Sequence, residues 1–478
     1  MSYETVIGLE IHAELSTATK MYCGCPTSFG SEPNMHCCPI CLAMPGTLPV
    51  LNKKAVEYAI KAGLAMNCSI TDMGKQDRKN YFYPDLPKAY QISQLDTPIC
   101  VNGYIDITPG GKTKRIRINR IHIEEDAGKL LHDAAGSSTL VDYNRGGTPL
   151  IEIVTEPDIS SSEEARLFLE SVKAILQYIE VSDCKMEQGS LRCDVNISVR
   201  KKGENKLGTR TEMKNINSFK AAVRAIDFES NRHIEEIEYG GKLIQETRRW
   251  DDAKGESFSM RGKEEAQDYR YFPDPDLVYI AVSDEMIAQI KNSLPELPAA
   301  RKERYIGEYN LTPYDAEQIT NSKHLADFFE ECISCGATPK TVCNWLIGDI
   351  AKTLNEKNAE PADIPFSPAQ LSKLIELIEK GTISNTAGKK VLSEMFEKAR
   401  NPEEIVKELG LVQISDESAL LRIITEVVSA NPKSVEDYKA GKDKAIGYLI
   451  GQAMRATKGQ GNPQIIAKLL KDELDKNI

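Results

Sequence analysis

A strictly alternating stretch near the amino terminus, residues 6–15 (VIGLEIHAEL), constrains the fold more than any other feature of the sequence. Successive side chains of a β-strand point to opposite faces, so this stretch predicts a strand with one apolar and one polar face. Ile7, Leu9 and Ile11 lie on the apolar face, which we expect to pack on a core. Glu10 and His12 lie on the other face, where carboxylates and an imidazole suit a divalent cation or acid–base chemistry. For this strand alone, an ordinary solvated face is the alternative.

Three further stretches repeat the design of an apolar face opposite a charged one. Residues 191–200 and 209–214 alternate, and residues 150–156 place Glu152 inside an otherwise apolar strand, where a carboxylate must be paired, protonated or metal-bound. An antiparallel sheet can leave one such face open to water. Its carboxylates would hold magnesium and its basic groups phosphate oxygens, which together form a nucleotide–metal cradle; a solvated, charge-balanced face is the alternative. The basic and acidic groups concerned are Arg192, Asp194, Arg210, Glu212 and Lys214.

The stretch 115–125 alternates, shifts phase at Asn119-Arg120 and then alternates again until it ends in Glu124-Glu125-Asp126. One inserted residue is typical of a β-bulge, and bulges often redirect side chains at functional sites. The preceding segment 110–113 (GGKT) lacks the earlier glycine of a phosphate-binding P-loop, and no helical pattern follows it. We therefore expect a hairpin turn there.

Four cysteines form a C-x-C and a C-x2-C pair separated by 12 residues, within a loop rich in proline and glycine. This spacing predicts a structural zinc site, because two chelating turns can close a tetrahedral shell and order a loop that has no core of its own. Four thiolates leave no open coordination position, which argues against a stand-alone zinc hydrolase. Free thiols are the alternative, and Cys37 or His36 can take the place of one ligand. The predicted ligands are Cys23, Cys25, Cys38 and Cys41.

Charge and hydropathy restrict the class of protein. The formal net charge of −11 argues against a protein that coats nucleic acid, but it allows a local basic surface. No apolar run reaches membrane-spanning length, and no signal peptide is recognisable. We expect a cytoplasmic protein whose 12 cysteines remain reduced.

Helical periodicity is expected over residues 52–66, 164–179 and 219–233, and it dominates the chain beyond Leu294. A further break lies at Asn401-Pro402. Residues 433–478 carry nine basic and six acidic side chains, which favours RNA contact about as much as a solvated helical face. The pattern as a whole predicts the α+β class, with an antiparallel-sheet domain followed by helical ones.

Seven motifs of the sequence resemble those of one family. They are IGLEIH from Ile7, the four-cysteine loop, NYFYPDLPKAYQISQ from Asn80, IEEDAG from Ile123, DYNRGGTPLIE from Asp142, RCDVN from Arg192 and KGQGNP from Lys458. The chain is similar over nearly its whole length to the B subunits of the bacterial aspartyl-tRNA(Asn)/glutamyl-tRNA(Gln) amidotransferases.

The resemblance implies a cradle domain over residues 1–292, a helical domain over 293–405 and a tail domain over 406–478 that contacts tRNA. It implies a glutamine-dependent carbon–nitrogen ligase that acts as a heterotrimer with an amidase (glutaminase) subunit and a small third subunit. ATP and Mg²⁺ would serve to phosphorylate the side chain of glutamate or aspartate on a mischarged tRNA, and ammonia from the amidase would then form the amide. The alternative is a non-catalytic subunit that only binds tRNA.

Strand faces and family motifs together predict the site residues. We expect Glu10, His12, Glu125 and Glu152 as magnesium ligands, Asp194 and Glu212 at a second ion, and Arg192, Arg210 and Lys214 on phosphate oxygens. The route of ammonia or of the charged tRNA end would be lined by Lys79, Tyr81, Tyr83, Lys88 and Gln91. Lys458 and Asn462, which is also expected to cap a final helix, would contact tRNA.

Overall fold

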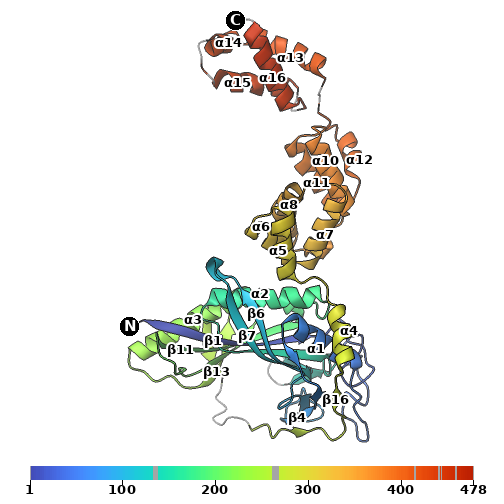
Figure 1. The fold of residues 1–478 in the computed structure, drawn as a ribbon, viewed down its shortest axis with the longest axis vertical. Coiled ribbons are helices and arrows are strands. Elements are labelled where there is room, and N and C mark those ends of the chain that lie inside the picture. Colours follow the sequence, from blue (N-terminus) through green and yellow to red (C-terminus); the bar gives the residue numbers. More distant parts are fainter. Residues whose placement is uncertain are drawn as a thin grey trace. The chain divides into compact units, whose positions relative to one another are not determined.

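The computed structural model describes all of the chain except residues 1, 133–137, 261–267, 414–415, 440–441, 443, 458–459 and 477–478. The chain divides into two compact units, Met1–Ala300 and Arg301–Ile478. Strands dominate the first unit and helices the second (Figure 1). The predicted α+β class is therefore confirmed.

The alternating segment forms β1 (Tyr3–Glu14), the middle strand of a sheet that comprises nine strands among the described residues. The other members are β2 (Ser69–Ile70), β6 (Cys100–Ile107), β7 (Lys114–Glu125), β10 (Pro149–Thr155), β11 (Leu191–Lys201), β12 (Thr211–Ile216), β13 (Glu246–Asp251) and β14 (Glu256–Ser259). Their order is β14-β13-β12-β11-β1-β10-β7-β6-β2. Neighbours run antiparallel except β12 and β13, which are parallel.

The two faces of β1 differ as the sequence predicts. Ile7, Leu9 and Ile11 are at most 1% exposed and belong to the core of the first unit, whereas Glu10 and His12 are only partly buried. The core face is covered by α1 (Lys53–Ala65), α2 (Ser162–Tyr178) and α3 (Phe219–Glu238), whose apolar residues belong to the same cluster. Figure 1 shows α2 and α3 along one side of the strands. The carboxylates of β1 therefore face away from the helices.

The expected bulge and hairpin are both present. The register of β7 against β10 shifts by one residue between Arg120 and Ile118, so that Asn119 is the extra residue. Both halves of β7 thereby direct isoleucines into the core, with Ile118 and Ile121 at most 1% exposed. The turn between β6 and β7 contains η1 (Pro109–Gly111), where Gly110 and Gly111 have φ of 56° and 81°.

Shorter strands complete the first unit. β4 (Asp77–Asn80), β5 (Tyr90–Ser93) and β15 (Phe272–Pro273) form a small sheet in the order β15-β4-β5, and β3 (Met73–Gly74) pairs with β16 (Ile280–Ala281). β8 (Lys129–His132) pairs with β9 (Thr139–Asp142). The remaining helical segments are η2 (Met186–Gln188) and α4 (Asp284–Asn292). In the small sheet, β5 lies against the end of β7, since Gln91 Nε2 donates to the backbone oxygen of Glu125 at 2.7 Å.

The second unit is helical throughout its described elements. Ser367 and Gln370 form the predicted capping box, with Gln370 Oε1 accepting from the Ser367 backbone N–H at 2.8 Å. Apolar residues between Leu420 and Leu474 form a cluster of their own. The helices are α5 (Pro298–Tyr309), α6 (Pro313–Thr320), α7 (Lys323–Ser334), α8 (Pro339–Trp345), the π-helical η3 (Leu346–Ile350), α9 (Ala351–Lys357), η4 (Pro361–Asp363), α10 (Pro368–Glu379), α11 (Asn385–Lys398), α12 (Pro402–Glu408), α13 (Glu417–Ala430), α14 (Pro432–Lys439), α15 (Lys444–Ala456) and α16 (Pro463–Lys476).

The division at residues 292 and 405 stays a prediction. The first compact unit ends at Ala300, within the first turn of α5.

Among the described helices, none combines the length and the apolar character needed to cross a lipid bilayer.

Candidate functional site

Three side chains from three neighbouring strands meet on the polar face of the main sheet. His12 of β1 lies 3.4 Å through Nε2 from a carboxylate oxygen of Glu124 on β7 and 3.4 Å from one of Glu152 on β10. One ligand atom of each residue lies within 4.8 Å of those of the other two. The side chain of Glu124 is 3% exposed, whereas those of Glu152 and His12 are 12% and 21% exposed, so the fold encloses most of this group but not all of it.

Strand pairing places these groups. His12 is the register partner of Glu152, and Glu152 is in turn the partner of His122, so three polar side chains stand in one row across the sheet. Glu124 follows two residues after His122 and therefore points to the same face. His122 Nε2 lies 3.3 Å from the Glu152 carboxylate, while its Nδ1 is buried without a hydrogen-bond partner in the described chain.

Burial and neighbouring charges act in opposite directions on these groups. Burial acts to lower the pKa of His122, but Glu124 and Glu152 outweigh it and raise that pKa to about 9. The same two carboxylates raise the pKa of His12 against its burial. Burial acts to raise the pKa of Glu152, but hydrogen bonds from His12 and His122 lower it well below its ordinary value. The imidazoles and the carboxylates thus favour each other's charged forms.

A second group, of three carboxylates, lies beside the first. Ligand atoms of Glu10 on β1, Asp194 on β11 and Glu212 on β12 lie within 4.8 Å of one another. Lys214 Nζ lies 2.7 Å from an oxygen of Asp194 and 2.9 Å from one of Glu212. The structure thus brings Asp194 and Glu212 together with Glu10, which the prediction had grouped with His12; that these residues bind an ion stays a prediction.

Two neutral side chains orient this second group. Asn196 Nδ2 donates to Glu10 Oε1 at 2.8 Å, and Thr247 of β13 donates through Oγ1 to Glu212 Oε2 at 2.7 Å. Burial and the negative charge of Glu152, Glu212 and Asp194 raise the pKa of Glu10, although the Asn196 hydrogen bond opposes this. A crowd of like charges held by the backbone is an arrangement that a bound cation would stabilise.

Both groups fit a hard divalent cation. Carboxylate oxygens with one imidazole suit Mg²⁺ or Mn²⁺, and a site of carboxylates alone suits Mg²⁺. The ligand atoms are close enough together to share one ion, and their carriers are fixed by a hydrogen-bonded sheet. The arrangement can therefore hold a polyphosphate through cations.

The prediction that placed Glu125 with Glu10 and His12 is not what the structure shows. Glu125 lies two and four residues after Ile123 and Ile121 and therefore shares their face of β7. Its side chain leaves the strand on the opposite side from that of Glu124. Its carboxylate accepts from Lys88 Nζ and, at 3.1 Å, from the backbone N–H of Ile92. Glu125 also lines a cavity with Lys20, Tyr22 and Lys88, between the cysteine loop and β5.

Arg192 is held by a third acidic group at the end of the same face. Its Nη2 donates to Asp126 Oδ2 at 2.8 Å, and Arg145 approaches the same carboxylate at 3.5 Å. Its Nε is buried and has no partner among the described residues. Burial and the adjacent Asp126 raise the pKa of Glu14 to about 8. Arg192 is thus available to an anion only in part.

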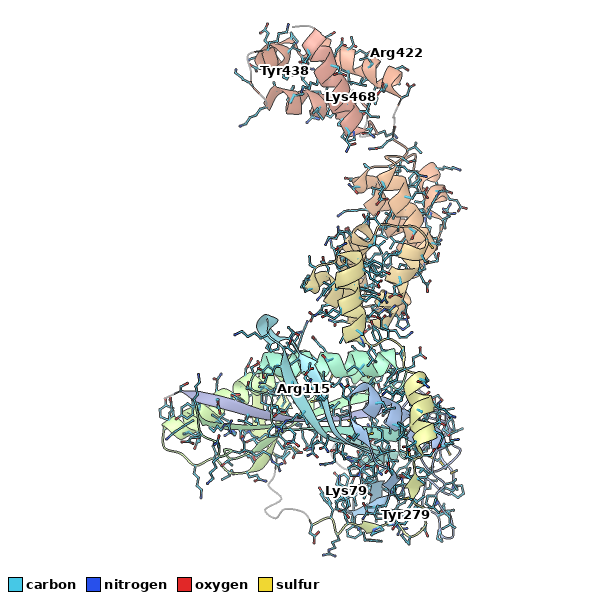
Figure 2. The ribbon with its side chains drawn as sticks, viewed as in Figure 1. Lys79, Arg115, Tyr279, Arg422, Tyr438 and Lys468 are labelled. Carbon is cyan, nitrogen blue, oxygen red and sulfur yellow. The ribbon has the colours of Figure 1, made fainter. Side chains whose placement is uncertain are left out.

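The other predicted binding residues are distributed over three places. Lys79 extends from β4 (Figure 2) with Nζ 5.1 Å from the ring centre of Tyr269, which also contacts Tyr81 at a ring separation of 6.1 Å. Lys88 and Gln91 both hold Glu125, through its carboxylate and its backbone oxygen respectively. Tyr83 and Arg210 are exposed.

The four predicted zinc ligands come together in a loop without regular secondary structure. The sulfur atoms of Cys23, Cys25, Cys38 and Cys41 lie within 4.8 Å of one another, and those of Cys38 and Cys41 are 3.9 Å apart. Tetrahedral zinc with Zn–S bonds of about 2.3 Å requires sulfur separations of about 3.8 Å. The set fits zinc with small adjustments. Cys37 does not belong to it.

In the tail, Asn462 caps α16, accepting through Oδ1 from the backbone N–H of Gln464 at 3.0 Å. The cap is the one that the sequence predicted. Lys458, the other predicted tRNA contact, lies outside the described residues. A role of either residue in tRNA binding stays a prediction.

Sequence reasoning missed Glu124, His122 and Asp126 as members of the site. The signal was present for Glu124 and His122, because both alternate with Ile121 and Ile123 after the bulge. Asp126 belongs to the acidic end of this stretch, but alternation did not place it, because it follows the end of β7 and is positioned by backbone hydrogen bonds to Thr148 and Gly147.

Comparison with known families matches two parts of the chain. Residues 5–288 match the GatB/GatE catalytic domain, and residues 327–474 match the GatB domain. The first match contains both carboxylate groups and the cysteine loop, and the second covers most of the helical unit.

Full-length relatives are similar to the chain from end to end. It is 62% identical to the B subunit of the aspartyl/glutamyl-tRNA(Asn/Gln) amidotransferase of Caldicellulosiruptor bescii, with 100% of each chain covered. It is 58% identical to the protein of the same name from a Thermoanaerobacter species and 56% identical to that from Clostridium botulinum, again with 100% of each chain covered.

Proposed function

Because the chain belongs to the family of the GatB/GatE catalytic domain, we propose that it is the subunit of a tRNA-dependent amidotransferase that activates and amidates the misacylated amino acid. The substrate would be glutamate on tRNA(Gln) or aspartate on tRNA(Asn). The subunit would therefore belong to a glutamine-dependent carbon–nitrogen ligase of protein biosynthesis, working in the cytoplasm where tRNAs are charged.

The observation that carries this proposal is the convergence of two carboxylate groups on one sheet face. His12, Glu124 and Glu152 form one, and Glu10, Asp194 and Glu212 form the other. The negative charge of Glu152 raises the pKa of Glu10, so the two carboxylate groups interact electrostatically. Phosphoryl transfer depends mainly on positioning and charge neutralisation, which a rigid face of this kind supplies.

A carboxylate is a poor acyl donor because oxide would have to leave. In the proposed reaction, a side-chain carboxylate oxygen of the aminoacyl group attacks the γ-phosphorus of ATP, and the bond to the β–γ bridging oxygen breaks to release ADP. Ammonia then attacks the acyl carbon, phosphate leaves, and a proton is lost from nitrogen to give the amide. Each half of the reaction needs cationic groups near oxygens that gain negative charge.

The chain's own residues would provide these groups. When bound, Mg²⁺ would offset phosphate charge, held by the two carboxylate groups of the sheet face. Lys214 would turn from Asp194 and Glu212 toward a phosphate oxygen, and Arg192 would offer its remaining N–H groups at the end of the face. Arg210 precedes β12 and is exposed, so it would reach the nucleotide from solvent.

Ammonia would come from a separate amidase subunit, with a small third subunit completing a heterotrimer. The cavity lined by Lys88 and Glu125 lies behind the carboxylate face, because Glu124 and Glu125 leave β7 on opposite sides. We propose that ammonia or the charged tRNA end passes along this side, near Gln91, Lys79, Tyr81 and Tyr83. The tail would contact tRNA through Lys458 and Asn462, and the cysteine loop would hold a structural zinc ion.

The test is transfer of the γ-phosphoryl group of labelled ATP, measured in the complex co-expressed with its amidase partner. Glu-tRNA(Gln) and Asp-tRNA(Asn) are each supplied as the acceptor, and correctly charged Gln-tRNA(Gln) serves as the control. The expected result is Mg²⁺-dependent ATP hydrolysis with a mischarged tRNA and formation of the amide. ATP hydrolysis that is absent with both mischarged tRNAs would refute the proposal and leave a subunit that only binds tRNA.

A further inference from the structure

Lys20 is buried within the first unit beside the cysteine loop, with 1% of its surface exposed. Burying an ammonium group is costly unless nearby groups compensate for its lost hydration. In the described chain no carboxylate lies within ion-pair distance of Lys20. The compensation must therefore come from other acceptors.

Three acceptors surround the ammonium nitrogen, which has three N–H bonds to give. Lys20 Nζ donates to the backbone oxygen of His36 at 2.7 Å, to that of Tyr143 at 3.0 Å and to Cys41 Sγ at 3.7 Å. Two of these acceptors are neutral carbonyl groups. The third belongs to the four-cysteine set, and it is the one that can carry a full negative charge.

The charge of that set explains why a lysine is buried here. Cysteine binds zinc as thiolate, so four thiolates and Zn²⁺ together retain a formal charge of −2. From the geometry we infer that Lys20 is the cation that compensates this charge: it acts on the metal through Cys41 and is a positioning residue, not a ligand. This inference rests on the zinc centre proposed above.

Lys20 connects three segments of the chain through its backbone and its side chain. Its backbone N–H donates to the Cys25 oxygen at 2.9 Å, next to the first chelating turn. The His36 oxygen precedes the second chelating turn, and the Tyr143 oxygen belongs to the turn that leads into β10. Lys20 thus joins both halves of the zinc loop to the strand that carries Glu152.

The surroundings leave room for this side chain. Gly147 has φ of 88°, and a Cβ atom added there would lie 3.4 Å from Lys20 Cδ. Its backbone oxygen accepts from the Met21 N–H at 2.8 Å. The turn around Gly147 therefore closes over the lysine stem.

The experiment compares Lys20→Met, Lys20→Gln and Lys20→Arg with the unaltered protein, all in the full complex. Lys61→Met is the control, because Lys61 is partly buried and, like Lys20, donates to a carbonyl oxygen, that of Ile179 at 2.8 Å, but does not contact the cysteine set. Zinc content is measured after dialysis, and the rate of zinc release is followed with a chromogenic chelator.

Loss of a group that supports a metal ligand typically costs about 10–100-fold in metal affinity. We expect Lys20→Met and Lys20→Gln to release zinc faster by about that factor, whereas Lys20→Arg stays within about threefold and Lys61→Met is unchanged. Release from both neutral variants at the unaltered rate would overturn the inference. Absence of zinc from the unaltered protein would instead refute the zinc centre itself.

If a neutral variant does not accumulate as folded protein, it is refolded over a zinc titration. Recovery at raised zinc supports the inference, since mass action then overcomes a weakened affinity. Failure at every zinc concentration overturns it, because Lys20 would then serve the fold independently of the metal.

Discussion

The sheet face and the cysteine loop each gather metal-ligating side chains, but they do so by different means. On the sheet face, His12, Glu152 and Asp194 come from separate strands that are fixed by continuous backbone pairing. In the loop, Cys23 and Cys41 belong to a segment with no helix or strand of its own. The face is therefore organised before an ion arrives, whereas the order of the loop depends more on the ion.

The two regions also differ in how they balance charge. The face has several counter-ions, with Lys214 between Asp194 and Glu212 and with His122 beside Glu152, whereas Lys20 is the cation that we infer for the loop. Such a site can bind and release a cation without losing its structure. A structural zinc loop has no such need to exchange its metal, and its residues do not have to hold their positions without it.

Removal of zinc should have the largest effect, and it should disorder the cysteine loop but not the sheet face. Structural zinc binding to small domains is worth on the order of 10 kcal/mol. After chelation, amide protons of residues 23–47 are expected to exchange rapidly, while those of β1 keep their protection. The measurement is hydrogen exchange by mass spectrometry on zinc-loaded and stripped protein. Equal protection of the loop in both samples would show that the loop, like the face, is ordered without metal.

Glu124→Gln should abolish the activity of the face without unfolding it. Loss of one preorganised electrostatic partner costs on the order of 10²–10³-fold in turnover. We expect Mn²⁺ binding, followed by electron paramagnetic resonance, and tRNA-dependent ATP hydrolysis to fall together. Glu125→Gln serves as the comparison and should leave Mn²⁺ binding at this face intact. If Glu125→Gln alone removed the ion, Glu125 and not Glu124 would be the ligand.

Glu229→Gln should loosen the edge of the sheet that carries Glu212. Glu229 is fully buried; burial acts to raise its pKa, but hydrogen bonds from His233 and Arg232 outweigh it and lower the pKa to about 2. A lowered pKa gives stability that is present above the unfolded value of 4.5 and is lost as pH falls toward 2. The substitution should therefore cost about 3 kcal/mol at pH 7 and less below pH 4.5.

Trp250 fluorescence during urea unfolding reports this edge, since Trp250 lies on β13 and is 1% exposed. The second tryptophan, Trp345, is replaced by phenylalanine in both proteins that are compared. An equal loss of stability at pH 7 and at pH 3.5 would contradict the assigned charge on Glu229.

Thr247→Val should give the smallest effect, through one hydrogen bond to Glu212. A hydrogen bond to a charged group contributes about 1.5–3 kcal/mol, so turnover should fall by roughly tenfold at the lower end. Thr247→Ser keeps the hydroxyl group and should retain most activity. If the valine and serine variants behaved alike, the orientation of Glu212 would not depend on this contact.

Much of this arrangement could be predicted from the sequence, because period-two alternation fixes which face a side chain takes. That rule gave the faces of β1 and β11 and the proximity of Asp194 to Glu212. The spacing of the cysteines likewise predicted the four that meet. Both are local patterns, and the backbone enforces each of them over a few residues.

Other parts depend on tertiary contacts that no local pattern states. The prediction named Glu125 and not Glu124, although alternation with Ile121 and Ile123 places Glu124 on the polar face of the strand. The positions of Lys88 and Gln91 follow from the packing of β5 on the end of β7, and these two residues lie 37 and 34 positions before Glu125 in the sequence. Strand order alone would not have revealed it.

The extra residue at Asn119 has a consequence for how this segment can change. Conservative replacement of Asn119 alters one exposed side chain. Deletion of Asn119 would instead move every side chain in one half of β7 to the opposite face of the sheet. Isoleucines of that half would then meet water, and its charged side chains would enter the apolar core. Here the number of residues in the strand, more than their identity, is what natural variation cannot easily alter.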